Sequence, residues 1–188
     1  MTLSLVTGGA GFVGRHLVRA LKARGESVRA LDLVAAADVE TIIGSIDDSA
    51  IAAKAVTGAD TVFHLAGNAQ LWAKDRSAFE RVNHLGTRVM LEAAVKAGVR
   101  RFIHCSSLTT LIGEKTPIGT SNADEGILLS PDEMLGPYPR SKRLAEIAVE
   151  EAVRRGIDAV IAIPTEPLGP GDESLTPPTR MILDLLDG

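Results

Sequence analysis

Near its start the chain reads Thr7-Gly8-Gly9-Ala10-Gly11-Phe12-Val13-Gly14, directly after the apolar run Leu3–Thr7. The glycines fit G-x-x-G-x-x-G and, counted from Gly9, also G-x-G-x-x-G. A tight strand-to-helix turn that a pyrophosphate can approach requires glycine, and the helix N-terminus offers free amides and a positive dipole to the phosphates. A glycine turn that binds nothing is the alternative, but the strand before it, the helix after it and an acidic residue downstream favour a dinucleotide. We therefore expect cofactor contacts from Gly8, Gly11, Phe12, Val13 and Gly14.

Short runs rich in Val, Ile and Leu alternate with helical stretches along the rest of the chain. This alternation is typical of a parallel sheet with helices on both faces. Right-handed crossovers then predict a Rossmann-type, doubly wound α/β sheet with the strand order 3-2-1-4-5-6. The expected strands are Leu3–Thr7, Ser27–Leu33, Glu40–Ile43, Thr61–Leu65, Arg101–Ser106 and Ala159–Ile163. The expected helices are one that follows the glycine loop and stops at Gly25, and others over about 86–97, 139–155 and 179–186.

Composition and charge narrow the class of protein. Of the 188 residues, 45 % are hydrophobic and 23 % charged, which suits one globular domain with a substantial core. The net charge is −4 with both signs scattered, so we expect neither nucleic acid nor a membrane as partner. Cys105 is the single cysteine, which excludes an internal disulfide, and the first residues leave no room for a signal peptide before the glycine loop. We expect a cytoplasmic protein that acts on a small molecule.

Asp32 ends the second expected strand and is the acidic residue downstream of the glycines. A carboxylate there accepts hydrogen bonds from the adenosine ribose hydroxyls and repels a 2′-phosphate. Leu33, also expected to contact the cofactor, and Val34 bring no arginine to such a phosphate, so NAD is favoured over NADP. A solvated strand-end aspartate is the alternative, and Arg15 and Arg29 remain conceivable phosphate partners.

Two further segments are expected along the cofactor because they follow strands at the same edge of the sheet. Ser45 and Ile46, after the third strand, are predicted to lie along the adenine. Leu65, Ala66 and Gly67, after the fourth strand, would pass beneath the cofactor, where small residues permit close approach.

Tyr138 is the only tyrosine of the chain, and it stands four residues before Lys142 in Tyr138-Pro139-Arg140-Ser141-Lys142. On a helix these positions lie one turn apart on the same face. A free tyrosine has a pKa of about 10, so we expect the Lys142 ammonium to lower the pKa of Tyr138 for use as an acid or base. Both side chains would also contact the cofactor, with Lys142 on the nicotinamide ribose. An ordinary amphipathic helix with a chance Y-x-x-x-K is the alternative.

A hydroxyl that polarises the substrate oxygen is expected where the fifth strand ends. Ser107 is favoured, with Ser106 or Thr109 as substitutes, and Ser106 is also expected near the cofactor. Strand-end serines that only satisfy backbone groups are the alternative. Asn83 is predicted to contact the cofactor side of the site by holding a water or the backbone near Lys142, or merely to cap the next helix.

Other conspicuous residues have plainer interpretations. His64 is expected to be a satisfied core histidine, and Cys105 a buried small apolar residue. Trp72 either lines the substrate pocket or simply packs. No spacing of His, Cys and carboxylates predicts a metal site.

The C-terminal part of the sequence differs from the rest in its proline and glycine content. Five prolines and two glycines between Pro164 and Pro178 predict an ordered but irregular connection, and the apolar helix after it needs a cover. We expect residues 1–163 to form a dinucleotide-binding domain and residues 164–188 to begin a substrate lobe that is mostly absent. A fragment, a naturally short paralogue and one half of an assembly are all consistent with this, and a homodimer or another partner would cover the helix.

Taken together, these motifs resemble the extended short-chain dehydrogenases/reductases, also called the NAD-dependent epimerase/dehydratase family. The resemblance is carried by T-G-G-A-G-F-V-G, V-F-H-L-A-G, V-N-H-L-G-T, C-S-S, Y-P-R-S-K and I-P-T-E-P-L-G-P-G-D. It is strongest to the dihydroflavonol-reductase-like and hopanoid-associated sugar epimerase branch. The resemblance implies Tyr138 as the acid/base, Lys142 as its helper, Ser107 as the polarising hydroxyl, and Pro164 and Thr165 at the nicotinamide.

The chain also departs from the family pattern. Ser45-Ile46 stands where family members carry Asp followed by Ile or Leu. The spacing from Ser107 to Gly113 is one residue longer than in the sugar-nucleotide epimerases. No acidic residue follows Leu108, which argues against the 4,6-dehydratases.

Two functions are consistent with these residues. The first is an NAD-dependent oxidoreductase or epimerase that transfers hydride to or from a carbinol or carbonyl carbon of a sugar-nucleotide-like or small ketone substrate. The second is a dinucleotide-binding module or regulator without catalysis, because fold alone does not settle function.

Overall fold

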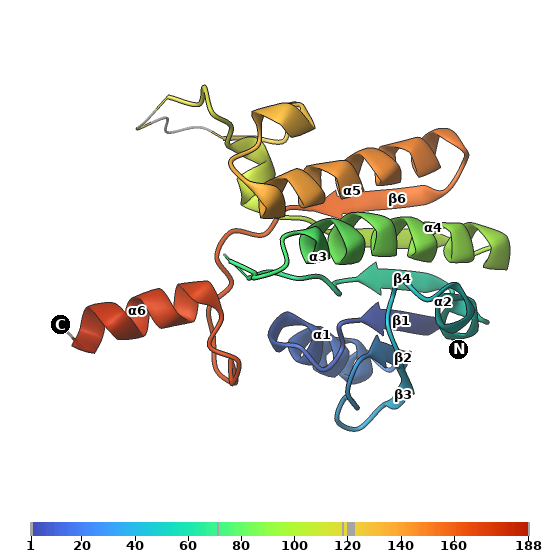
Figure 1. Cartoon of the computed structure of the whole chain (residues 1–188). Coiled ribbons are helices and arrows are strands. Elements are labelled where there is room, and N and C mark those ends of the chain that lie inside the picture. The colour runs from blue at the N-terminus through green and yellow to red at the C-terminus, as the bar shows by residue number, and fades with distance from the viewer. Residues whose placement is uncertain (1, 71, 118, 120–122, 188) are drawn as a thin grey trace.

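Six parallel strands form one sheet in the order β3-β2-β1-β4-β5-β6, which confirms the predicted topology (Figure 1). The structure, a computed structural model, describes residues 2–70, 72–117, 119 and 123–187. The first residue of the predicted domain 1–163 and the last residue of the predicted segment 164–188 therefore lie outside the described residues. The strands are β1 (Leu3–Thr7), β2 (Ser27–Asp32), β3 (Glu40–Ile43), β4 (Thr61–His64), β5 (Arg101–Cys105) and β6 (Asp158–Ala162).

Helices cover both faces of the sheet because successive strand residues point to opposite sides. Leu5 and Val62 face the larger core, which is shared with α2 (Ser49–Val56), α4 (Gly86–Ala97) and α5 (Pro137–Arg154). Val6 faces the other way and packs against α1 (Phe12–Ala23). The doubly wound architecture predicted from the alternation is therefore present.

The observed elements differ from the predicted ones mainly at their ends. Strands β2, β4 and β5 each stop one residue early, and β6 is shifted by one, so that the following residues are free to turn at the carboxyl edge. Helix α5 begins at Pro137, because a proline in the first turn lacks only an N–H that has no partner there.

Helix α2 was not predicted. Its buried residues are two alanines and a valine, which give only a weak hydrophobic pattern over a short stretch. The signal that would have revealed it is Asp48, whose side chain accepts from the amides of Ala50 and Ile51 as an N-cap.

The helical region before β5 starts earlier than predicted and changes its winding. After the short α3 (Ser77–Phe79) comes a π-helical turn, η1 (Glu80–Leu85), which runs directly into α4. Such turns frequently occur at functional sites, and this one carries Asn83.

After β6 the chain crosses the carboxyl edge of the sheet and then leaves it. His16 of α1 contacts the carbonyl of Pro170 at 2.9 Å, and Arg15 donates to the carbonyl of Gly171 at 3.0 Å. The terminal helix α6 (Pro177–Asp187) stands apart from the sheet (Figure 1), and none of its residues is buried. The predicted irregular connection and exposed apolar helix are both present.

None of the described helices is long and apolar enough to cross a membrane. Within the described ranges, no group of three or more His, Cys, Asp and Glu side chains is placed to hold a metal ion.

Candidate functional site

The glycine loop between β1 and α1 is a backbone turn without room for side chains. A Cβ on Gly14 would lie 1.9 Å from the carbonyl oxygen of Gly8, and one on Gly8 would lie 2.9 Å from the amide nitrogen of Ala66. Helix α1 begins with Gly11 as its N-cap and no side-chain cap, so its first amides can serve an anionic ligand. Phe12 is half-buried and Val13 exposed beside them. The loop therefore fits a pyrophosphate group held by backbone.

Asp32 joins the end of β2 to this loop. One carboxylate oxygen accepts from the amide of Ala10 at 2.9 Å, and the other accepts from the amide of Leu33 at 2.7 Å. A carboxylate has about four acceptor sites, so both oxygens can still accept from a ribose diol. The adjacent Leu33 is exposed.

The two arginines near this end of the chain are already engaged. Arg15 pairs with Glu173 at 2.8 Å in addition to its bond to Gly171. Arg29 pairs with Glu40 at 3.1 Å and donates to the carbonyls of Ala55 and Thr57. Neither arginine is therefore available to pair with the 2′-phosphate of NADP beside Asp32.

The two residues predicted along the adenine face different surroundings. Ser45 is partly exposed after β3. Ile46 is a core residue, packed so closely on the start of α4 that a Cβ on Gly86 would lie 2.8 Å from its Cδ1. Any contact of Ile46 with a ligand would have to come from its main chain.

The segment after β4 runs between the glycine loop and α5. Leu65 packs against the α1 side of the core, and the Ala66 amide donates to the Thr7 hydroxyl at 3.1 Å. Gly67 is exposed, but a Cβ there would lie 3.0 Å from Asn83 Oδ1 and 3.2 Å from Lys142 Nζ. The absence of a side chain at Gly67 lets Asn83 and Lys142 approach the same point.

Asn83 is buried in the π turn and does not cap a helix. Its Oδ1 accepts from the amide of Asn68 at 2.7 Å, and its Nδ2 donates to the Asn68 carbonyl at 3.0 Å and to Ser141 Oγ at 2.9 Å. The alternative that it holds the backbone beside Lys142 is thus the observed arrangement, and the capping alternative is wrong.

Lys142 is buried one helical turn after Tyr138. Its Nζ donates to the carbonyl of Cys105, where β5 ends, at 3.0 Å. Burial lowers the pKa of Lys142, while Cys105 and Glu146 act in the opposite direction. The carbonyl at the end of β5 is therefore the partner that orients this ammonium group.

Tyr138 and Ser107 meet where α5 begins and β5 ends. Burial raises the pKa of Tyr138 above its usual value, a side-chain hydrogen bond with Ser107 lowers it, and Cys105 raises it further. The expectation that Lys142 sets a lowered pKa for Tyr138 is wrong for this arrangement, because burial dominates and the ammonium is directed to a carbonyl.

Of the three candidate hydroxyls at the end of β5, Ser107 and Thr109 are bonded to each other, whereas Ser106 has a different partner. Ser107 Oγ accepts from the Thr109 amide at 3.3 Å and from its hydroxyl at 3.0 Å. Both acceptor sites of Ser107 are then filled, so its own O–H is the group left to donate to Tyr138 or to a substrate oxygen. Ser106 instead donates to the buried carboxylate of Glu146, a residue that the sequence analysis did not single out.

Pro164 and Thr165 lie beside the same strand end. The carbonyl of Pro164 accepts from the Leu108 amide at 3.3 Å, which ties the start of the C-terminal segment to the turn after Ser107. Thr165 is exposed.

His64 is a core histidine with both ring nitrogens in hydrogen bonds, as expected. Thr87 donates its hydroxyl to the Asn83 carbonyl at 2.6 Å, so it accepts from His64 Nε2 at 2.9 Å. His64 Nδ1 then accepts from Thr7 at 2.8 Å. Burial lowers the pKa of His64 to about 3, with Lys142 adding to the effect, so the ring is neutral. Cys105 is half-buried, and burial raises the pKa of its thiol.

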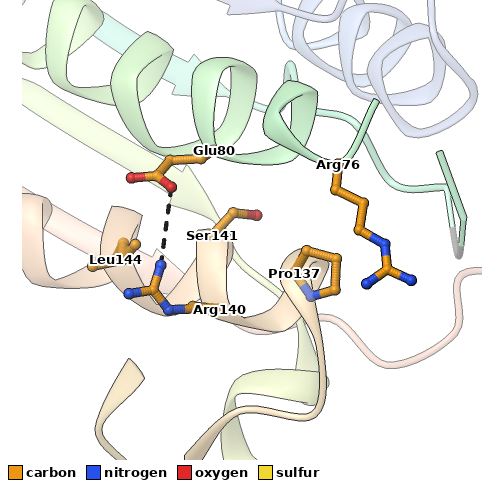
Figure 2. A pocket seen from close by; sticks show the side chains of 6 residues that line it. All are labelled: Arg76, Glu80, Pro137, Arg140, Ser141 and Leu144. Carbon is orange, nitrogen blue, oxygen red and sulfur yellow. Dashed lines mark ion pairs between the residues drawn. The ribbon is translucent and has the colours of Figure 1, made fainter. Parts of the chain in front are cut away.

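A small pocket lies beside the start of α5, and none of the predicted site residues lines it. It has a volume of about 60 Å³ and lies between the π turn and the first turns of α5. Figure 2 shows Glu80 reaching from the π turn towards Arg140, with which it pairs at 3.9 Å. Its lining residues are Arg76, Glu80, Pro137, Arg140, Ser141 and Leu144.

Comparison with known sequences gives one family match and several relatives. The model of the NAD dependent epimerase/dehydratase family matches residues 4–187. A protein of Synechocystis sp. named putative dihydroflavonol 4-reductase is 38 % identical over 188 residues, which cover 96 % of this chain and 54 % of that protein. The chain thus spans about half the length of the curated relatives it matches.

Solved structures with the same fold include two that contain NAD. A short-chain dehydrogenase/reductase superfamily protein from Agrobacterium tumefaciens with bound NAD is 35 % identical, with a TM-score of 0.74 over 85 % of this chain and 48 % of that one. The Thermus thermophilus UDP-glucose 4-epimerase in complex with NAD is 26 % identical, with a TM-score of 0.85 over 97 % of this chain and 61 % of that one.

Proposed function

The chain belongs to the NAD dependent epimerase/dehydratase family, and on this basis we propose that it is the nucleotide-binding part of an NAD-dependent oxidoreductase or epimerase. The substrate would be a small molecule with a carbinol or carbonyl carbon, of the sugar-nucleotide-like or small-ketone kind. The observation that carries the proposal is the hydrogen bond from Lys142 to the Cys105 carbonyl at 3.0 Å, which holds the helix that carries Tyr138 against the end of β5, directly before Ser107.

The cofactor would lie across the carboxyl edge from β2 to β5. The glycine loop and the first amides of α1 would hold the pyrophosphate, and Asp32 would accept from the adenosine ribose. The engagement of Arg15 and Arg29 elsewhere supports NAD over NADP. When bound, the nicotinamide would supply the site that accepts or donates hydride.

Proton transfer would be the task of Tyr138. Ser107 would donate its free O–H to the substrate oxygen, and Tyr138 would give that oxygen a proton during reduction or remove one during oxidation. Because its pKa is raised, Tyr138 is a phenol at neutral pH, which favours the role of proton donor. Asn83 and the Cys105 carbonyl would keep Lys142 and α5 in position.

We also propose that residues 1–163 are the nucleotide-binding domain and that residues 164–188 begin a substrate lobe. The support is that β6 completes the sheet, whereas none of the α6 residues is buried. A second copy of the chain or another polypeptide would cover α6. The single cysteine supports a reducing, cytoplasmic location.

The test is calorimetric titration of the chain with NAD, NADH, NADP and NADPH, followed by a search for hydride transfer. NADH absorbance would be followed with a panel of ketones, alcohols and sugar nucleotides, with Tyr138→Phe as the inactive comparison. Binding of NAD and NADH together with turnover that Tyr138→Phe abolishes supports the proposal. Turnover by Tyr138→Phe at the unsubstituted rate contradicts it, and binding without turnover of any compound favours a non-catalytic dinucleotide-binding module.

A further inference from the structure

Glu146 is a buried carboxylate on α5 that the proposed reaction leaves without a role. It is only 5 % exposed, and it lies one turn beyond Lys142 and two turns beyond Tyr138. Its position places it on the same face of the helix as these two residues. A buried acid in such a place requires hydrogen-bond partners, since an unpaired buried charge is strongly unfavourable.

Both oxygens of Glu146 have partners. Oε1 accepts from the Ser106 hydroxyl and from Thr110 Oγ1, the latter at 2.8 Å. Oε2 pairs with Arg143 at 3.0 Å. The same guanidinium also pairs with Glu150 at 2.9 Å and donates to the Leu129 carbonyl at 2.8 Å, so Arg143 is itself fixed.

The two hydroxyl partners of Glu146 stand on either side of Ser107. Ser106 is the residue before it, and Thr110 lies in the following 3₁₀ turn, η2 (Leu108–Leu111), of which Ser107 is the N-cap. The Thr110 hydroxyl is also 2.9 Å from the Ser107 carbonyl. One carboxylate therefore holds both ends of the turn that presents Ser107.

Glu146 and Tyr138 belong to the same rigid helix, whereas Ser107 lies on a turn that could otherwise move relative to that helix. We propose that Glu146 is a positioning residue that fixes the turn carrying Ser107 against α5, the helix of Tyr138, by binding Ser106 and Thr110. This inference rests on the proposed role of Tyr138 and Ser107, but the contacts that carry it involve neither cofactor nor substrate. With Glu146 included, the site takes side chains from three successive turns of α5, at Tyr138, Lys142 and Glu146.

The test uses the fact that Tyr138 is the only tyrosine of the chain. The absorbance of phenolate near 295 nm as the pH rises therefore reports Tyr138 alone, in the full chain and without any ligand. Ser107→Ala should raise the pKa of Tyr138 by about half to one unit, because the Ser107 side chain acts to lower that pKa. Glu146→Gln should raise it in the same direction, and the double variant should rise no further than Ser107→Ala.

The direction of the shift separates positioning from electrostatics. Loss of a negative charge two turns away on its own favours the phenolate and lowers the pKa of Tyr138. A shift upward in Glu146→Gln therefore reports the lost Ser107 contact. Cys105 of β5 acts on the pKa of Tyr138, and it is unchanged in every variant, as are Lys142 on α5 and the buried His64 and His104.

Glu150→Gln is the matched control, because Glu150 pairs with the same arginine but touches neither Ser106 nor Thr110. It should leave the titration of Tyr138 unchanged. If Glu146→Gln does not fold, Ser106→Ala and Thr110→Val each remove one contact to Glu146 and are judged by the same upward shift. Circular dichroism over the same pH range verifies that each variant stays folded.

Three results would overturn the inference. The first is a folded Glu146→Gln whose Tyr138 titrates as in the unsubstituted chain. The second is an upward shift in Glu146→Gln that adds to that of Ser107→Ala in the double variant. The third is a Ser107→Ala variant without any shift. None of these results depends on whether the chain binds NAD. The outcome for Glu146 is therefore independent of the outcome for the proposed oxidoreductase function.

Discussion

The side-chain amide of Asn83 donates to the hydroxyl of Ser141 at 2.9 Å and so links the π turn to the helix that carries Tyr138 and Lys142. The same side chain clamps the backbone of Asn68 through two bonds, at 2.7 and 3.0 Å. Three segments that are distant in sequence therefore meet at one buried amide. This geometry explains why an asparagine, with both donors and an acceptor, occupies the turn.

Asn83→Ala should destabilise the chain, because it removes the partners of the half-buried amide and carbonyl groups of Asn68 and of the Ser141 hydroxyl. We expect a loss of about 1–3 kcal/mol in the free energy of unfolding, measured by urea denaturation. Asn68→Ala is the control, since its bonds to Asn83 use the main chain and persist. Equal losses in both variants would contradict the account.

Gly14→Ala should abolish dinucleotide binding. The new Cβ would lie 1.9 Å from a backbone carbonyl, and backbone cannot move aside as a flexible side chain can. Calorimetric titration with NADH measures the loss. Arg19→Ala, at an exposed position of the same helix, should bind NADH as the unsubstituted chain does. Retained binding in Gly14→Ala would show that the loop is not the phosphate site.

Asp32→Ala should weaken NADH binding by about ten- to hundredfold, the value of one or two hydrogen bonds to a charged acceptor. It also removes the link to the Ala10 amide and the charge that repels a 2′-phosphate, so the affinity for NADPH relative to NADH should rise. Parallel titrations with both cofactors measure this ratio. Glu92→Gln, at an exposed position of α4, should leave the ratio unchanged.

The raised pKa of Tyr138 predicts opposite pH profiles for the two directions of hydride transfer. Reduction needs the phenol, so its rate should be constant through neutral pH and fall as the pH passes the raised pKa. Oxidation needs the phenolate and should increase up to the same point. Initial rates of reduction and of oxidation, followed by NADH absorbance over a range of pH with any substrate found in the panel, test both pH profiles. A reduction rate that falls between pH 6 and 8 would argue against Tyr138 as the donor.

Acid should destabilise the chain partly through His64. Its pKa is about 3 in the folded protein against about 6.5 for a free histidine, so the unfolded state binds a proton first as the pH falls. The contribution to stability is complete above about pH 6.5 and is lost progressively towards pH 3. Urea denaturation at pH 7 and pH 5 should show a smaller pH dependence in His64→Gln than in the unsubstituted chain.

The fold could be predicted from sequence because its decisive signals are local. The glycine spacing after β1 and the alternation of apolar runs define the strands, and the handedness of crossovers then leaves few possible orders. Helix α2 could not be predicted from hydrophobic periodicity, because an alanine-rich stretch shows little contrast between an apolar and a polar face. Its Asp48 cap was the better signal.

Those features of the site that follow from residue type and from spacing along a helix could be predicted from the sequence. That Tyr138 and Lys142 share a face follows from their separation by four residues. The rest depends on tertiary packing: the burial that raises the pKa of Tyr138, the Cys105 carbonyl that takes the Lys142 ammonium, and the placing of Glu146 under Ser106. No spacing within one helix or strand encodes these contacts.

The bonds from Arg15 to Gly171 and Glu173 join positions that are 156 and 158 residues apart in the chain. Synthesis proceeds from the N-terminus at about 5–20 residues per second. The start of α1 therefore leaves the ribosome roughly 8–30 s before the segment 170–173 that it contacts. Until then Arg15 and His16 lack their partners in residues 170–173, so any earlier folding of α1 on the sheet proceeds without these bonds.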